Sequence, residues 1–119
     1  MAEAPGTTSW VFYGECDVPS DAPLINGEQA VAAYKTVRDV AIFTDRRLIV
    51  RDAQGVTGKK VEMYSVPWSS VNMWSTENAG HLDLTAEVEL WTRAGHIKIS
   101  LKRGVDVRKV DRLIAECVL

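Results

Sequence analysis

From Arg38 to Gly80 the chain alternates apolar and polar side chains in short runs that end at Gly, Asp, Asn or Pro. A period of two places apolar side chains on one face of an extended strand, and these four residue types favour the turns between antiparallel strands. The pattern therefore predicts consecutive short strands. They are expected over residues 39–44, 47–52, 60–66 and 68–76, after a first strand at 28–37 whose alanines would also suit a helix.

Two of these strands differ in how many apolar faces they have. Residues 39–44 are apolar on both faces, so this strand is expected to be covered on both sides. In the next strand Leu48 and Val50 point inward, and Ile49 lies between two arginines on the opposite face. The pattern therefore predicts Ile49 on an outer face of the sheet.

The last two strands read as a hairpin. With Ala94-Gly95 as its turn, Val88 pairs with Leu101, and Trp91 lies opposite Lys98 on the outer face. The register therefore predicts a polar outer face with one large aromatic side chain, Trp91. A slip by one residue would bury charged side chains instead.

After Gly104 the apolar period changes from two to about 3.6, as an amphipathic helix requires. Asp106 is placed to cap the first turn of this helix by accepting backbone N–H groups. Seven strands followed by a covering helix predict a mainly β fold, either a small barrel or an orthogonal sandwich.

Length and composition agree with a single globular domain. The chain has 119 residues, of which 46% are hydrophobic and 25% charged. An apolar run of the roughly 18 residues that a membrane-spanning helix needs is missing, as is a secretory signal pattern, so a cytoplasmic location is expected. Cys16 and Cys117 lie far apart and have no metal-ligand spacing, which favours free thiols over a disulfide or a zinc site. No cofactor is expected.

Charge is distributed unevenly along the chain. Residues 1–28 contain five acidic and no basic residues, whereas residues 29–119 contain 14 basic and 11 acidic ones. We interpret residues 1–23 as an acidic leader before a domain at 24–119. The leader is either solvated or docks by charge on its own domain or on another subunit. Its apolar cluster, which includes Trp10 and Phe12, would be unfavourable to leave in water.

Several spaced motifs resemble the bacterial pleckstrin-homology-like family. The motifs are FTDRRLIVRDAQGVTGKKVEMYSVPW and WSTENAGHLDLTAEVELW, within a match over about residues 24–119. Trp68, Trp74 and Asn78 depart from the residues usual in that family. The resemblance implies a PH-like barrel of two roughly orthogonal antiparallel sheets with one C-terminal α-helix. It also implies cyclic homo-oligomers, expected to be five-fold, with no established enzymatic role.

Outward aromatic and aliphatic side chains are the candidates for a subunit interface. We predict this role for Trp74, Trp91, Ile49, Trp10 and Phe12. Trp74 has an alternative, which is to pack beneath the helix. The function expected is a noncatalytic module that self-associates, as a ring, and serves as a scaffold for an unknown protein partner.

A cluster of basic residues suggests an alternative function, the binding of an anionic lipid headgroup or phosphate. Its candidates are Lys35, Arg38, Arg46, Arg47, Lys59 and Lys60. Interleaved acidic residues favour salt bridges over a lipid site, and the isoelectric point near 5.6 argues against nucleic acid. His81 with Asp83 reads as turn chemistry, and His96 has no acidic neighbour at ligand spacing, so no catalytic or metal residues are expected.

Overall fold

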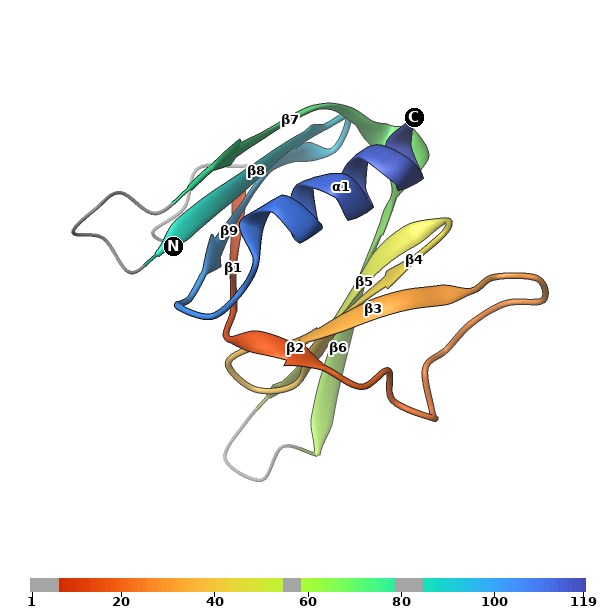
Figure 1. Ribbon diagram of the computed structural model, residues 1–119. Helices are drawn as coiled ribbons and strands as arrows, with labels where there is room; N and C mark the ends of the chain where they lie inside the picture. The colour runs from red at the N-terminus through yellow and green to blue at the C-terminus, as the bar shows by residue number, and fades with distance from the viewer. Residues whose placement is uncertain (1–6, 55–58, 79–84) are drawn as a thin grey trace.

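The computed structural model describes residues 7–54, 59–78 and 85–119 (Figure 1). Within these ranges it contains nine strands, one short 3-10 helix and one α-helix. They are β1 (Thr7–Phe12), β2 (Gly14–Cys16), β3 (Ala30–Lys35), β4 (Val40–Thr44), β5 (Arg47–Gln54), β6 (Lys60–Pro67), η1 (Trp68–Ser70), β7 (Val71–Glu77), β8 (Ala86–Thr92), β9 (Gly95–Leu101) and α1 (Val107–Val118). Every predicted strand is present, although residues 68–70 of the strand predicted at 68–76 form η1, and β1 and β2 are additional.

The strands form a four-stranded sheet of order β1-β9-β8-β7 and a five-stranded sheet of order β2-β3-β4-β5-β6. The two extra strands come from the predicted leader. β1 pairs with β9 and β2 pairs with β3, so the described part of the leader belongs to both sheets and is no separate arm. The β1–β9 pair is parallel, which corrects the prediction of purely antiparallel sheets. Trp10 and Phe12, two residues apart, both pack toward the main core, as side chains on one face of a strand do.

The main core lies between the two sheets, which diverge and do not close into a barrel (Figure 1). The α1 helix lies across the open end between them and contacts β7, β8 and η1. Val110 and Ile114 are buried on its apolar face, and the Asp106 side chain accepts the backbone N–H groups of Arg108 and Lys109. The predicted capped, amphipathic helix is therefore confirmed. Among the described residues no helix is long and apolar enough to cross a membrane.

The β8–β9 hairpin keeps the predicted faces but not the predicted register. Its turn is Arg93-Ala94, and Trp91 lies opposite His96, so the pairing is shifted by two residues. The Thr92 hydroxyl closes this turn, because it accepts the backbone N–H groups of Ala94 and Gly95. A shift of two leaves each side chain on its own face, which is why Trp91 still points outward.

A second, smaller core lies on the outer face of the five-stranded sheet. It consists of Ala33, Val40, Ile42 and Ile49, with Cys16, Ala22 and Ala30 packed against it. This core confirms that β4 is covered on both faces. It also shows that the prediction of an exposed Ile49 is wrong, since this side chain is 0% exposed. The segment that follows β2 supplies the cover, which no pattern within β5 could reveal.

Candidate functional site

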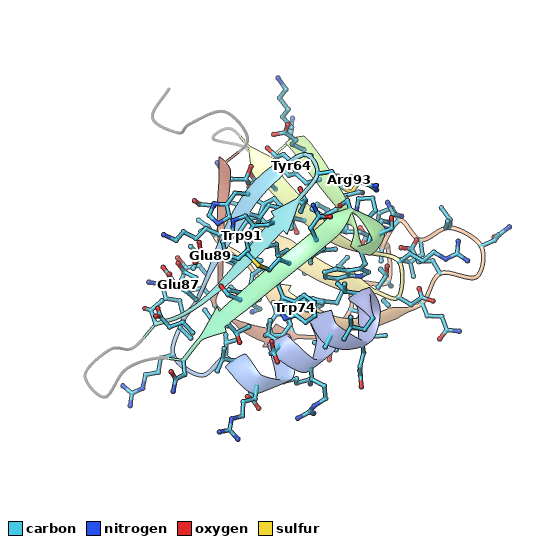
Figure 2. The ribbon with its side chains drawn as sticks, turned by 90° about the horizontal axis from the view of Figure 1, so that it is seen from above. Tyr64, Trp74, Glu87, Glu89, Trp91 and Arg93 are labelled. Atoms are coloured by element: carbon cyan, nitrogen blue, oxygen red, sulfur yellow. The ribbon has the colours of Figure 1, made fainter. Side chains whose placement is uncertain are left out.

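The outer face of the four-stranded sheet gathers the predicted aromatic side chain and several charges. Alternation in β7, β8 and β9 puts one set of side chains on this face, in rows that the strand register defines. We call this set the tryptophan face: Met73, Ser75, Glu77, Glu87, Glu89, Trp91, His96 and Lys98. Figure 2 shows Trp91, Glu89 and Glu87 following one another along β8.

Trp91 and His96 form the centre of the tryptophan face. Their rings stack with centroids 5.0 Å apart and an interplanar angle of 26°. The Nε2 atom of His96 lies 2.8 Å from the Oε1 atom of Glu89. Glu89 is seven residues from His96 and so is not an acidic neighbour at ligand spacing, but the register puts it diagonally across the hairpin from His96. The contacts hold the indole in one orientation while leaving it half-buried at the surface.

Met73 and two glutamates extend this centre in opposite directions along the sheet. Met73 lies directly across from Trp91 and is 54% exposed. At the far end Glu77 of β7 lies opposite Glu87 of β8. Two like charges directly opposite each other destabilise a strand pair. The face therefore combines an exposed apolar centre with an acidic end that would gain from a basic partner.

The other predicted interface residues lie elsewhere. Phe12 is 0% exposed, so its prediction as an interface anchor is wrong, because β1 turns this side chain into the main core between the sheets. Trp74 packs on the main core beside α1, and its Nε1 atom donates to Asp111 Oδ1 at 2.9 Å (Figure 2). The alternative placement beneath the helix is therefore confirmed. Of the five candidates, Trp91 lies on the outer face, and Trp10 is half-buried at the seam between the sheets.

Trp10 meets β6 of the opposite sheet at this seam. Its ring lies 5.6 Å from that of Tyr64, centroid to centroid. Beside the pair is a cavity of about 160 Å³, whose other lining residues come from β1, from the end of β6 and from the β8–β9 hairpin around its turn. The cavity has apolar walls from Trp10 and Tyr64 and polar groups from Thr92 and His96.

The predicted basic cluster does not form as one site. Lys35 and Arg38 lie at the β3–β4 turn, and Lys59 and Lys60 lie at the start of β6 next to the end of β5. Arg46 and Arg47 lie at the other end of β5. Lys60 pairs with Gln54, which lies seven residues along β5 from Arg47, a distance of roughly 23 Å at about 3.3 Å per residue. The prediction that all six converge is therefore wrong, because successive turns of a meander lie at opposite ends of the sheet.

Arg47 has a structural role that the sequence did not reveal. It makes two bonds to the buried carboxylate of Glu28, at 2.9 and 3.0 Å, and a third to the backbone oxygen of Pro23. Thr44 donates to the same carboxylate at 2.7 Å. The hydrogen bond from Arg47 is the main reason that the pKa of Glu28 is lowered to about 2. Glu28 and Arg47 are far apart along the chain, so no local spacing signals the pair.

A second group of ion pairs, around Arg51, also holds the chain between β2 and β3. Arg51 bonds Asp39 at 3.0 Å and Asp21 at 3.1 Å. The prediction of a salt-bridge network around these basic residues is confirmed at Arg47 and Arg51. We call the chain from residue 17 to 29, held by Asp21 and Glu28, the covering segment. It buries Ile42 and Ile49 on the outer face of the five-stranded sheet.

No group of three or more His, Cys, Asp or Glu in the described ranges is arranged to hold a metal ion. Cys16 and Cys117 are free thiols, as predicted, and burial is the main reason that the pKa of each is raised. The turn with His81 and Asp83 lies outside the described residues.

The chain is similar to proteins of one family. A family model described as "Bacterial PH domain" matches residues 10–118. The uncharacterized protein YjqA of Bacillus subtilis is 50% identical over 95 residues, which cover 77% of this chain and 76% of YjqA. The uncharacterized protein YozO of the same organism is 25% identical over 96 residues, 81% of this chain and 83% of YozO.

Solved structures agree with this assignment. A DUF1696 family protein with a pleckstrin-homology domain from Shewanella loihica has a TM-score of 0.75 and 40% identity, over 81% of this chain and 84% of that one. A pleckstrin-homology domain from Shewanella amazonensis has a TM-score of 0.66 and 42% identity, over 81% and 79%. The fold predicted from the sequence, two sheets with a C-terminal helix, is thus confirmed as PH-like. The chain belongs to the bacterial PH domain family.

Proposed function

We propose that this chain is a noncatalytic PH-like module that self-associates through the tryptophan face and acts as a scaffold for a protein partner. The observation that supports this most directly is the exposed centre of the face, where Met73 and the Trp91–His96 stack lie side by side. Aromatic and methionine side chains are enriched at protein interfaces. Their contacts within the sheet already fix the indole, so association loses little side-chain entropy.

A ring needs two different surfaces on each copy, because a head-to-tail contact repeats around the axis. We propose that the second surface is the groove between α1 and β7, of about 570 Å³. Arg108 and Arg112 line this groove and are both exposed. Placed against the acidic end of a neighbouring tryptophan face, they would relieve the repulsion between Glu77 and Glu87. Charge complementarity of this kind fixes orientation and suppresses wrong contacts.

The anion-binding alternative has less support than self-association. Arg47 is held by Glu28, and Arg46 lies with it at the far end of β5 from the other four cations. A lipid headgroup or phosphate would therefore meet at most the group formed by Lys35, Arg38, Lys59 and Lys60. Sedimentation with anionic vesicles at low and at physiological salt tests this alternative separately.

Light scattering coupled to size-exclusion chromatography tests the self-association. We expect the wild type to have a mass that is a multiple of 13.2 kDa at tens of micromolar and falls on dilution. Trp91→Asp should be monomeric and folded, because it places a charge at the centre of the contact. Tyr13→Asp is the matched control, since Tyr13 is an exposed aromatic away from the tryptophan face. A strictly monomeric wild type would refute the proposal.

Charge reversal tests the pairing of the two surfaces. Arg108→Glu together with Arg112→Glu should weaken assembly, and Glu77→Lys together with Glu87→Lys should weaken it alike. Mixing the two double variants should restore assembly in alternating order, since both surfaces of each variant are then complementary in charge to those of the other. An oligomer that none of these variants alters would show that the groove is not the second surface.

A further inference from the structure

The β6 strand has an edge that no strand of the described chain covers. It is the last strand of the five-stranded sheet and pairs only with β5. Its register with β5 runs without interruption over all eight residues. A long, regular edge of this kind is a template for a further strand, which natural proteins usually shorten, twist or cover.

The hydrogen-bond pattern shows which residues face this edge. The backbone N–H of Trp68 donates to the oxygen of Arg46, just beyond the paired strands. In an antiparallel pair, residues alternate between bonding the partner strand and facing away from it. Even-numbered residues of β6 therefore bond β5. The N–H and C=O groups of Val61, Met63 and Ser65 point to the open edge, and all three residues are exposed.

The cavity beside Trp10 and Tyr64 lies next to the same stretch of β6. Tyr64, Ser65 and Val66 form one of its walls, and the β8–β9 turn and β1 form the others. Its volume of about 160 Å³ is well below the roughly 300 to 1,000 Å³ of sites that enclose a whole small molecule. A space of this size suits a single side chain. Its walls of Trp10 and Tyr64 favour an aliphatic one.

Basic side chains lie near both ends of β6. Lys60 begins the strand and is exposed. At the other end, the guanidinium of Arg93 reaches the backbone oxygen of Ser69 in η1, directly after β6. A strand added along β6 would therefore meet cations near each of its own ends, which favours acidic residues there.

We propose that β6 binds an extended peptide segment of a partner protein by strand addition. Backbone bonds to Val61, Met63 and Ser65 supply the affinity, one aliphatic side chain enters the cavity beside Trp10, and acidic residues flank it. Edge pairing with side-chain pockets is a recurrent mode of peptide recognition. The inference rests on the part of the proposed function that gives the module a protein partner, and it names the chemistry of that partner.

Synthetic octapeptides test the proposal by fluorescence polarisation. Each has two aspartates at either end and a threonine-rich centre around one leucine, isoleucine or valine. Met63→Pro removes one outward N–H without touching a bond to β5, a substitution that edge strands tolerate. Met63→Thr is the matched control that keeps this N–H. We expect at least one peptide to bind the wild type. The dissociation constant of the same peptide should be within about threefold of the wild-type value for Met63→Thr and at least tenfold higher for Met63→Pro.

Two peptide controls and the oligomeric state complete the test. Replacing the central aliphatic residue by glycine, or the aspartates by lysines, should each weaken binding to the wild type. Equal binding to both Met63 variants, or no binding of any peptide at 1 mM, would overturn the inference. A drop in oligomer mass in Met63→Pro, but not in Met63→Thr, would show that β6 meets a second copy and would overturn it too. Dissociation by Trp91→Asp reports on the self-association independently.

Discussion

The outer faces of the two sheets have similar side chains, but the rest of the chain covers only one of them. On the five-stranded sheet the covering segment lies over Ile42 and Ile49, and two ion-pair groups hold it in place. On the four-stranded sheet, Trp91 and Met73 remain at the surface. Both faces have apolar side chains among charged ones.

The comparison indicates that one outer face contributes to the stability of the fold and the other to interaction with other molecules. The ion pair of Glu28 and Arg47 holds the covering segment over the first face. Its charges are matched and its oxygens and nitrogens are bonded to each other. The second face keeps its apolar centre accessible and places Glu77 opposite Glu87 at one end. The first face should therefore respond to substitution by losing stability, and the second by losing association.

The largest difference is expected from placing an aspartate on each face. Ile49→Asp puts an unpaired charge in a fully buried site, so we expect it to lower the free energy of unfolding by more than about 4 kcal/mol. Met73→Asp changes a half-exposed side chain and should lower it by less than about 1 kcal/mol. Urea denaturation measures both. Similar losses in the two variants would contradict the comparison.

Removing the charge of Glu28 should have the next largest effect. Glu28→Gln leaves Arg47 without its buried counter-charge, and we expect a loss of about 3 kcal/mol in urea denaturation. Asp21→Asn is the control, because Asp21 is mostly exposed in its pair with Arg51 and should lose less than about 1 kcal/mol. A loss in Glu28→Gln no greater than in the control would show that the covering segment is held mainly by its apolar contacts.

The stability that Glu28 contributes should depend on pH in a defined window. The folded-state pKa is lowered from 4.5 to about 2, so the contribution is complete above about pH 4.5 and disappears as the pH falls toward 2. The wild type should therefore approach the stability of Glu28→Gln over this range. Denaturation midpoints of both proteins between pH 6 and pH 2 check this. A constant gap down to pH 2 would contradict the assignment.

The strands and the helix were predictable because their signals are local. Alternation places Leu48 and Val50 inside, and Asp106 precedes a run with helical period. What covers a strand face is not local, so the burial of Ile49 by the covering segment could not be foreseen. The Glu28–Arg47 pair and the separation of Arg46 from Lys35 depend on topology in the same way. The hairpin register was missed because Thr92, rather than glycine alone, fixes the turn.

The smallest effect is expected at Trp74, which links the four-stranded sheet to α1. Trp74→Phe keeps most of the packing but loses the hydrogen bond to Asp111. We expect a loss of about 1 kcal/mol in the free energy of unfolding and no change in oligomer mass. Asp111→Asn keeps an acceptor oxygen and should lose less. A change in oligomer mass in Trp74→Phe would mean that this residue also contributes to the contact between copies.

The central claim is that the tryptophan face, and not the face of the five-stranded sheet, meets another copy. Met73 and Met63 allow a direct test, because they are 54% and 51% exposed on the two different sheets. Hydroxyl-radical footprinting of the wild type, at protein concentrations below and above the association range, measures the oxidation of each methionine. We predict that Met73 becomes protected from oxidation on association while Met63 does not. Protection of Met63 with unchanged oxidation of Met73 would contradict it.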